Sequence, residues 1–224
     1  MAVTGPKPLA TMNVNSIETE LFGEKVYVLW NEDGGNATII DPGMMNPRDC
    51  DRLNGLLESH HLTPEKILLT HFHIDHVAGI NWLVEKYHLP VYGCMKDEML
   101  ISMLPMQAAF FHLKLDMAIE FTVDHPIVHG DSIEVCSETL RVLETPGHTP
   151  GSVSFHGAES KVLFSGDTLF QESIGRTDLP GGNYRQLIES ITDHLLTLPP
   201  DTIVLPGHGP STTIANEKRF NPYI

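Results

Sequence analysis

The chain has 224 residues, 41% of them hydrophobic, and a formal net charge of −15 from 29 acidic and 14 basic side chains. That length and apolar content suffice for one buried core, whereas binding to nucleic acid or an anionic membrane would require clustered Lys and Arg. Three scattered cysteines, without CxxC spacing, favour a reducing, cytoplasmic setting over a disulfide framework or a zinc-thiolate site.

Residues 1–11 (MAVTGPKPLAT) hold two prolines, two threonines and little that can be buried. They lack the apolar core of a secretory signal, and no later segment approaches the ~18 uninterrupted apolar residues of a membrane span. We predict that residues 1–11 are disordered or were added to the natural chain, with Met12 as its start. Residues 12–224 are expected to form a single domain, because no linker, repeat or composition break divides them.

Short apolar runs bounded by turn residues predict strands at 25–30, 37–43, 65–71, 90–93, 140–147, 152–156, 161–167 and 202–209. Apolar residues that return every three or four positions predict helices at 47–60, 77–88, 96–114 and 183–197. The mixture is α/β. Because the first strands follow one another in hairpin-like succession, a sheet sandwich with helices outside is favoured over a doubly wound sheet.

The predicted helix at 96–114 is rich in methionine and aromatic residues at helical spacing. This pattern favours a packing helix, with methionine as gap filler, over a helix that contacts substrate. Pro105 is expected to divide or kink it.

The stretch LLTHFHIDHVAG, residues 68–79, packs three histidines and one aspartate into six positions directly after an apolar run. In an extended segment the side chains at i and i+2 point the same way, so His71 and His73 can converge on one metal ion. Asp75 and His76 follow where the chain turns into a helix and can face a second point nearby. Imidazole and carboxylate suit zinc, iron or manganese.

Three further strand ends carry the same chemistry. ETPGHTPGS contains His148, LFSGDTLF contains Asp167, and VLPGHGP contains His208. Each residue follows an apolar run on a tight turn, which is how a rigid sheet presents a site with several ligands at one edge. The other histidines lack this pattern and are expected to be solvated or structural.

The stretch THFHIDH, followed by His148, Asp167 and His208, resembles the HxHxDH, H, D, H pattern of the metallo-β-lactamase superfamily from about residue 16 onward. The resemblance implies an αββα sandwich, two mixed sheets with helices on the outer faces, and a metal site at the sheet edge. It also implies one ion held by His71, His73 and His148 and another held by Asp75, His76 and His208, with Asp167 as the bridge.

The closer resemblance is to short, single-domain proteins of the glyoxalase II (hydroxyacylglutathione hydrolase) type, through the stretches TPGHTPGS, FSGDTLF, IGRTDLPGG and LPGHGPSTTIANEKRFNP. Longer glyoxalase II enzymes continue into a helical domain that contacts glutathione, whereas 16 residues follow His208 here. We therefore expect poor selectivity among thioesters and weak binding of the glutathione moiety.

The activity implied by this resemblance is hydrolysis of a small thioester by a metal-bound hydroxide. Two divalent metal ions, with zinc preferred over iron or manganese, would lower the pKa of a water from 15.7 toward ~7. Asp75 would orient the nucleophile in addition to binding metal. No serine or cysteine nucleophile is required.

Two alternatives remain open. Persulfide dioxygenases also resemble this chain, and they bind a single iron through two histidines and one aspartate, which correspond to His71, His148 and Asp167. A purely structural zinc site is disfavoured, because such sites close with four ligands and seven are present here. Arg176, in IGRTDLPGG, is expected either to bind a substrate carboxylate or to pair with Asp178.

Overall fold

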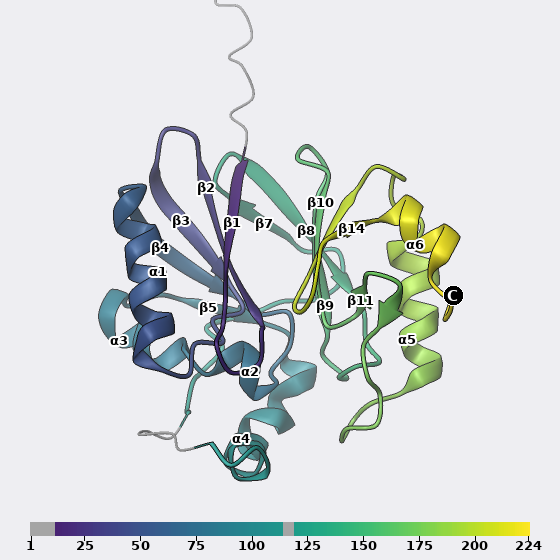
Figure 1. Ribbon diagram of the computed structural model, residues 1–224, viewed down its shortest axis with the longest axis horizontal. Helices are drawn as coiled ribbons and strands as arrows, with labels where there is room; N and C mark the ends of the chain where they lie inside the picture. Colours follow the sequence, from purple (N-terminus) through teal and green to yellow (C-terminus); the bar gives the residue numbers. More distant parts are fainter. Residues whose placement is uncertain (1–11, 114–118) are drawn as a thin grey trace, which may run out of the picture.

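The computed structural model describes residues 12–113 and 119–224 (Figure 1). The prediction made for residues 1–11 lies outside the described part. None of the described helices is long and apolar enough to cross a membrane.

The first sheet has the strand order β1-β2-β3-β4-β5-β6, which is also their order in the chain. Its strands are β1 (Met12–Glu18), β2 (Lys25–Asn31), β3 (Gly35–Ile40), β4 (Leu62–Leu68), β5 (Val91–Gly93) and β6 (His125–Pro126). The pairs β1–β2 and β2–β3 are antiparallel, and the pairs from β3 to β6 are parallel, so the sheet is mixed.

The second sheet has the order β14-β13-β10-β9-β8-β7 and is also mixed, because β10 and β13 are parallel. Its strands are β7 (Ser132–Val135), β8 (Glu138–Glu144), β9 (Val153–Gly157), β10 (Val162–Gly166), β13 (Ile203–Pro206) and β14 (Thr212–Thr213). A small hairpin, β11 (Leu169–Phe170) with β12 (Ser173–Ile174), follows β10.

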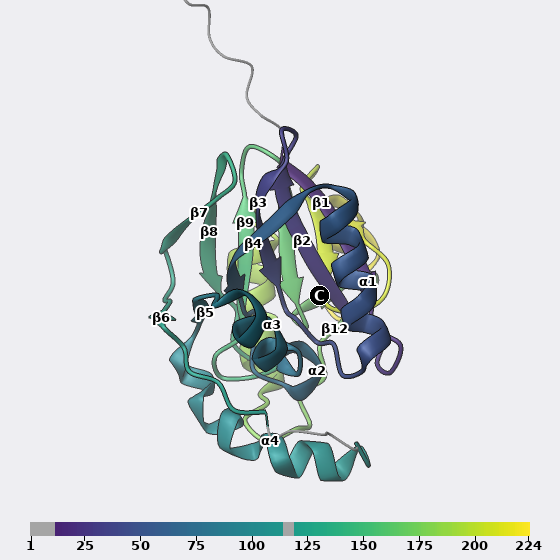
Figure 2. The same ribbon diagram turned by 90° about the vertical axis from the view of Figure 1, so that its left-hand side faces the viewer.

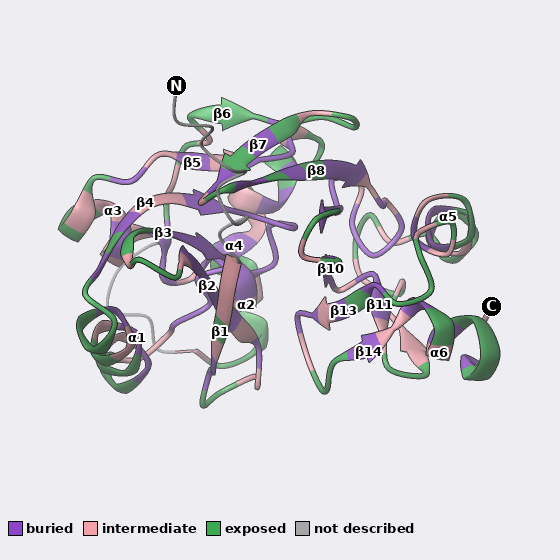
Figure 3. Cartoon of the chain, turned by 90° about the horizontal axis from the view of Figure 1, so that it is seen from above, coloured by how far each residue is buried: buried purple, intermediate pink, exposed green. Residues whose placement is uncertain are grey.

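Helices cover the outer faces of both sheets. They are α1 (Pro47–Ser59), α2 (Ile74–Val77), α3 (Ile80–Tyr87), α4 (Glu98–Phe110), α5 (Tyr184–Ser190) and α6 (Ile214–Phe220), with a 3-10 turn at Met95–Asp97 and a π-helical turn at Ile191–Leu195. Figures 1 and 3 show α1 and α3 against the first sheet and α5 and α6 against the second, whereas Figures 1 and 2 show α2 and α4 at the lower edge of the sandwich. The predicted αββα sandwich of two mixed sheets is confirmed.

The central strands are buried on both faces, which explains the nearly continuous apolar sequences of β2 and β10, whereas β7 and β8, at one edge of the second sheet, alternate buried and exposed residues. In β2, Val28 points into the cluster under the outer helices, whereas its neighbour Leu29 points into the cluster between the sheets. In β10, Phe164 faces the space between the sheets and Leu163 faces the layer that contains α5. Three apolar layers thus follow directly from the two-residue period of a strand.

Some sequence-based boundaries were wrong. Strand β1 was not predicted, because MNVNSIE has little apolar alternation and is ordered by its antiparallel pairing with β2. The helix predicted at 77–88 begins at Ile80 as α3, and a separate short helix, α2, precedes it; Gly79 between them donates its backbone N–H to the Pro42 carbonyl at 2.7 Å. Likewise, the helix predicted at 183–197 continues from α5 as a π-helical turn.

Pro105 does not divide α4, which continues through it. A proline inside a helix removes one hydrogen bond and crowds the preceding turn, at about 3 kcal/mol. Leu100, Leu104 and Ala108 on the same helix are buried in the core under the first sheet. That burial offsets the defect.

Gly43, in the loop after β3, tests how tightly the sheet edge is packed. A Cβ there would collide with the backbone oxygen of Asp75 and with the Glu24 carboxylate, whereas a Cβ at Gly55 in α1 meets nothing within 4 Å. We expect Gly43→Ala to lower the free energy of unfolding by about 1–3 kcal/mol or more. Gly55→Ala, the matched control, should raise it by about 0.5–1 kcal/mol. Guanidinium denaturation measures both, and an unchanged midpoint for Gly43→Ala would contradict the packing.

Candidate metal centre

The first half of the HxHxDH stretch lies beyond a strand end. Strand β4 ends at Leu68, three residues before the predicted end at residue 71, so His71 and His73 lie in the extended chain that follows it. His73 is the residue before α2, and Asp75 and His76 lie on that short helix. The motif therefore spans a strand-to-helix turn, which aims four side chains at the sheet edge.

The second half of the pattern comes from the other sheet, where His148, Asp167 and His208 follow β8, β10 and β13. The structure brings all seven predicted side chains together. Three groups have ligand atoms that all lie within 4.8 Å of one another, namely His71 with His73 and His148, His71 with His76 and Asp167, and Asp75 with His76 and His208. Because the groups share His71 and His76, they form one continuous cluster that could hold metal.

Three atoms at the centre of this cluster are buried and have no hydrogen-bond partner among the described residues. They are Nε2 of His71, Nε2 of His76 and Oδ1 of Asp167. A buried polar atom without a partner is destabilising by about 1–3 kcal/mol, so such atoms require an explanation. Lone pairs of imidazole and carboxylate that converge in this way fit a bound divalent cation.

The outer nitrogens of the histidines are held by hydrogen bonds. His148 donates from Nδ1 to the carbonyl oxygen of Arg176 at 2.8 Å, which leaves its Nε2 to face His73 Nδ1 at 2.9 Å. His208 donates from Nδ1 to the carbonyl of Phe22 at 3.2 Å. Backbone carbonyls that hold one ring nitrogen fix the tautomer and leave the other nitrogen free for a metal.

Asp41 holds two of the three remaining histidines, His76 directly and His71 through Thr70. It follows β3, and its carboxylate accepts hydrogen bonds from Thr70 N at 2.8 Å, Thr70 Oγ1 at 2.6 Å and His76 Nδ1 at 3.0 Å. Because the Thr70 hydroxyl donates to Asp41, its oxygen is left to accept from His71 Nδ1 at 3.1 Å. This chain of bonds orients Nε2 of both His71 and His76 toward the cluster.

Sequence reasoning missed two positioning carboxylates. Asp41 was seen only as the end of a strand, although its place in IIDPG, at a strand terminus, is the signal that singled out Asp167. Asp97 is buried and accepts from Phe72 N at 3.2 Å, Thr149 Oγ1 at 2.7 Å and Gly151 N at 2.6 Å. It ties the loop of His71 and His73 to the loop that carries His148, and no local pattern reveals that role.

Electrostatics keep two histidines neutral. Burial is the largest cause that lowers the pKa of His71, and it lowers the pKa of His73 to about 3. The neighbouring histidines add to the effect, chiefly His76 on His71 and His148 on His73. At neutral pH both rings are therefore unprotonated, which is the form that binds metal.

The carboxylates are held ionised. Burial by itself raises the pKa of Asp75, but the hydrogen bond from His208 and the charge on His76 outweigh it, so the pKa lies below the ordinary value. Burial likewise raises the pKa of Asp167, and the opposing charge of His76, whose Nε2 lies 3.5 Å from Asp167 Oδ1, depresses it well below its usual range. Asp167 in turn raises the pKa of His76 against the effect of burial, so metal binding there must release a proton.

The cluster opens into a cavity of about 470 Å³. Its ligand side is lined by His73, Asp75, His148, Asp167 and His208. Arg176 also lines it, but its guanidinium makes a bidentate pair with Asp178, with both N–O distances 2.7 Å. Of the two roles expected for Arg176, the structure shows the pairing with Asp178.

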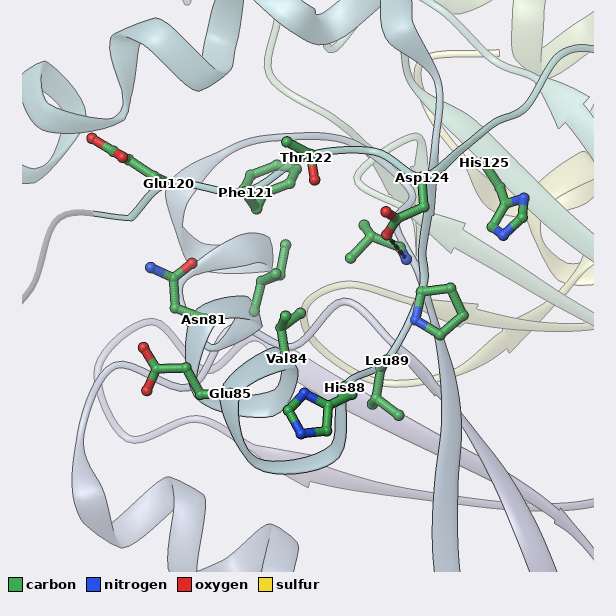
Figure 4. A pocket seen from close by; sticks show the side chains of 13 residues that line it. Asn81, Val84, Glu85, His88, Leu89, Glu120, Phe121, Thr122, Asp124 and His125 are labelled. Carbon is green, nitrogen blue, oxygen red and sulfur yellow. Dashed lines mark hydrogen bonds between the residues drawn. The ribbon is translucent and has the colours of Figure 1, made fainter.

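A larger hollow of about 900 Å³ lies between α3 and the segment that leads into β6 (Figure 4). Figure 4 shows Glu85 and His88 on the lower side of the hollow, from α3 and its C-terminal end, and Asp124 on the upper side, where Asp124 accepts from Val91 N at 2.9 Å. The three groups of possible metal ligands found among the described residues all lie at the smaller cavity and not in this hollow.

Comparison with known proteins gives the same family throughout. The model of the metallo-beta-lactamase superfamily matches residues 20–208. The hydroxyacylglutathione hydrolase GloC of Haemophilus influenzae is 40% identical over 215 residues, which cover 95% of this chain and 98% of that protein. The probable metallo-hydrolase YqgX of Bacillus subtilis is 36% identical over 198 residues, 88% of this chain and 90% of that protein.

Solved structures share the fold at similar identity. BLEG-1, a B3 metallo-beta-lactamase, superposes with a TM-score of 0.84 at 38% identity and covers 94% of this chain and 99% of its own. TTHA1623, in a di-iron-bound form, has a TM-score of 0.82 at 37% identity, covering 94% and 100%. ETHE1 from Myxococcus xanthus has a TM-score of 0.75 at 30% identity, covering 94% and 83%.

The Asp41 carboxylate generates a prediction about metal affinity. Asp41→Asn keeps the shape and tolerates the left-handed backbone (φ 51°), but it removes the charge that holds His76. We expect metal affinity to fall about 10–100-fold, measured by competition with a chromophoric chelator. Asp124→Asn, at the carboxylate that accepts from Val91 N in the other hollow, is the matched control and should bind as the wild type does. Equal affinities in the two variants would contradict this role of Asp41.

The lowered histidine pKa values predict how the chelated, metal-free protein responds to pH. Below the ordinary pKa of ~6.5, His71 and His73 become protonated in the unfolded chain but stay neutral in the folded protein. The free energy of unfolding therefore falls as the pH falls. His73, with its pKa of about 3, should contribute a slope of about 1.4 kcal/mol per pH unit between pH ~6.5 and 4.5, and His71 contributes a slope of the same sign. The raised pKa of His76 also stabilises the folded protein, but this contribution is already fully present below pH ~6.5. It therefore does not change the slope in this pH range.

Urea unfolding at a series of pH values measures the slope. The variant His73→Gln should have a slope that is smaller by the contribution of one histidine. Superimposable slopes for the variant and the wild type would show that His73 titrates normally in the folded protein.

Proposed function

Because the chain belongs to the metallo-beta-lactamase superfamily and gathers the superfamily's seven predicted ligands at one sheet edge, we propose that it is a metal-dependent hydrolase that cleaves small thioesters. One observation carries the proposal, which is the likeness to GloC, a hydroxyacylglutathione hydrolase, over 95% of this chain. The cluster geometry supports it, because the donor set is complete without a serine or cysteine nucleophile.

We assign the ligands in two sets. His71, His73 and His148 would hold one divalent ion, Asp75, His76 and His208 would hold the other, and Asp167 would bridge them. The overlap of the three groups through His71 and His76, and the position of Asp167 within 3.7 Å of both His148 and His208, support this division. Zinc is the first choice for this donor set, with iron or manganese as substitutes.

Bound there, the ions would bring the pKa of a water from 15.7 toward ~7 and polarise a carbonyl group. The protein's own residues supply the rest. Asp75 lies on the wall of the cavity, is ionised, and is oriented by His208 Nε2 at 3.3 Å, so it can accept a hydrogen bond from the attacking water. The carbonyls of Arg176 and Phe22 keep His148 and His208 from rotating during turnover.

The second candidate is a persulfide dioxygenase with one iron held by His71, His148 and Asp167. The observation that favours it is that these three side chains face one another, with the His71 and His148 rings 4.8 Å apart and His148 Nε2 3.7 Å from Asp167 Oδ2. Two histidines and a carboxylate on one face of an iron leave open positions for oxygen and a sulfur substrate.

Metal content tests the two-ion assignment. We expect about two first-row metal ions per chain by elemental analysis, and Asp167→Ala should lose at least one of them because nothing then offsets the repulsion of the pair. Its turnover should fall by about two orders of magnitude or more while circular dichroism stays native. Asp201→Ala, which removes an exposed carboxylate paired with Lys161, is the control and should retain both ions. A folded, metal-replete Asp167→Ala enzyme with near-normal activity would refute the bridge.

The reaction class is tested on one metal-defined preparation by parallel thioester and oxygen-electrode assays. Hydrolysis of S-D-lactoylglutathione should proceed without oxygen, because water is the co-substrate. Glutathione persulfide should cause no oxygen uptake. A β-lactam belongs in the same panel because of the likeness to BLEG-1. Strict dependence of turnover on oxygen, with one iron per chain, would establish the dioxygenase instead.

A further inference from the structure

Helix α4 has two apolar faces. Leu100, Leu104 and Ala108 are buried in the core, as the packing interpretation of its sequence requires. Its other side is also apolar yet exposed, with Met106 55% and Phe110 71% accessible. A helix that leaves large apolar side chains in water, beside a cavity, indicates a binding surface.

That second face lines the cavity of the metal centre. We define the apolar wall as Met103, Met106, Phe110 and Phe111 from α4 and its C-terminal turn, with Phe22 and Leu179 from two other loops. Its aromatic rings support one another, since Phe22 and Phe111 meet edge to face with centroids 5.1 Å apart, as do Phe110 and Phe111. The wall is thus a continuous apolar surface that ends at the ligand cluster.

Gln107 fixes the position of the apolar wall relative to the ligand cluster. Its side-chain oxygen accepts a hydrogen bond from Ile74 N at 3.0 Å, at the start of the helix that carries Asp75 and His76. A substrate arm on the wall is therefore positioned relative to the reacting carbonyl, as specificity requires.

Charge on the cavity lining argues against a strongly ionic substrate arm. Arg176 is the one Lys or Arg among the lining residues that the structure describes, and Asp178 already neutralises it. Glutathione carries two carboxylates, and a buried or half-buried carboxylate without a cationic partner binds poorly.

We propose that the apolar wall binds an uncharged apolar arm of the thioester, so that the enzyme prefers thioesters with alkyl or aryl groups over glutathione thioesters. This inference rests on the proposed thioesterase function and names its substrate class. The arm belongs either to the acyl group or to the thiol, and both place the same chemistry against the wall. The cavity volume of about 470 Å³ lies within the ~300–1,000 Å³ range of small-molecule sites.

The first experiment compares two thioester series on the metal-loaded enzyme. One lengthens the acyl group from acetyl to hexanoyl on neutral N-acetylcysteamine, and the other lengthens a simple alkyl thiol on an acetyl group. We expect kcat/KM to rise about fourfold per methylene in at least one series, which identifies the arm. S-Lactoyl-N-acetylcysteamine should also be cleaved at higher kcat/KM than S-lactoylglutathione.

The double variant Met103→Ser with Met106→Ser should flatten the rising series to less than twofold per methylene. Met99→Ser is the matched control, because Met99 is 53% exposed on the same helix but does not line the cavity. It should leave the gradient unchanged. Flat series in the wild type, or a preference for the glutathione thioester, would overturn the inference.

A second measurement separates this inference from the proposed function. Titration calorimetry of butyrate, hexanoate and octanoate with the metal-loaded protein should show affinity that rises with chain length, and the double variant should lose that rise. If no thioester is cleaved but this gradient is present, the proposed function fails and the apolar wall stands. Absence of any chain-length dependence in binding overturns the wall.

Discussion

The carboxylate of Asp41 and the hydroxyl of Thr70 form the junction on which the arrangement depends. Asp41 ends β3, and Thr70 follows β4, so their hydrogen bonds fix two neighbouring strand ends against each other. Thr70 also reaches the second sheet, because its carbonyl accepts from Val153 N at 2.8 Å and its side chain fills the space beside Gly166. A side chain at Gly166 would strike Thr70, so this close approach of the two sheets requires glycine.

Hydrogen bonds from that junction orient the candidate ligands. Thr70 and Asp41 hold His71 and His76, and Gly166 immediately precedes Asp167 in β10 and its turn. Tyr27, on the first sheet, donates from its hydroxyl to the carbonyl of Pro206 at 2.8 Å, just before His208. The two sheets are therefore tied together by polar contacts near the place where the cluster needs both of them.

The same cluster opposes folding. Buried histidines with lowered pKa values and buried atoms without partners are unfavourable in the absence of a ligand. By contrast, the raised pKa of His76 and the lowered pKa of Asp167 show that these two charges stabilise each other. Perturbed groups of this kind concentrate at functional sites. The large apolar layers around the cluster supply the stability that tolerates it, and the exposed face of α4 adds a second departure from ordinary packing at the same cavity.

The sequence by itself determined the types of the candidate ligands and favoured a sheet sandwich with helices outside, because both depend on local patterns, and the family resemblance added the αββα class. The i and i+2 histidines of THFHIDH, the strand-end residues His148, Asp167 and His208, and apolar runs long enough to be buried on two faces can all be found without a structure. Only the tertiary structure decided what holds the ligands in place. The roles of Asp41 and Asp97 arise from partners 25 to 54 positions away in the chain. Strand β1 forms because β2 supplies its hydrogen bonds. Helix α4 turns one apolar face to the core and another to the cavity. Which face does which depends on what packs around the helix and not on its own periodicity.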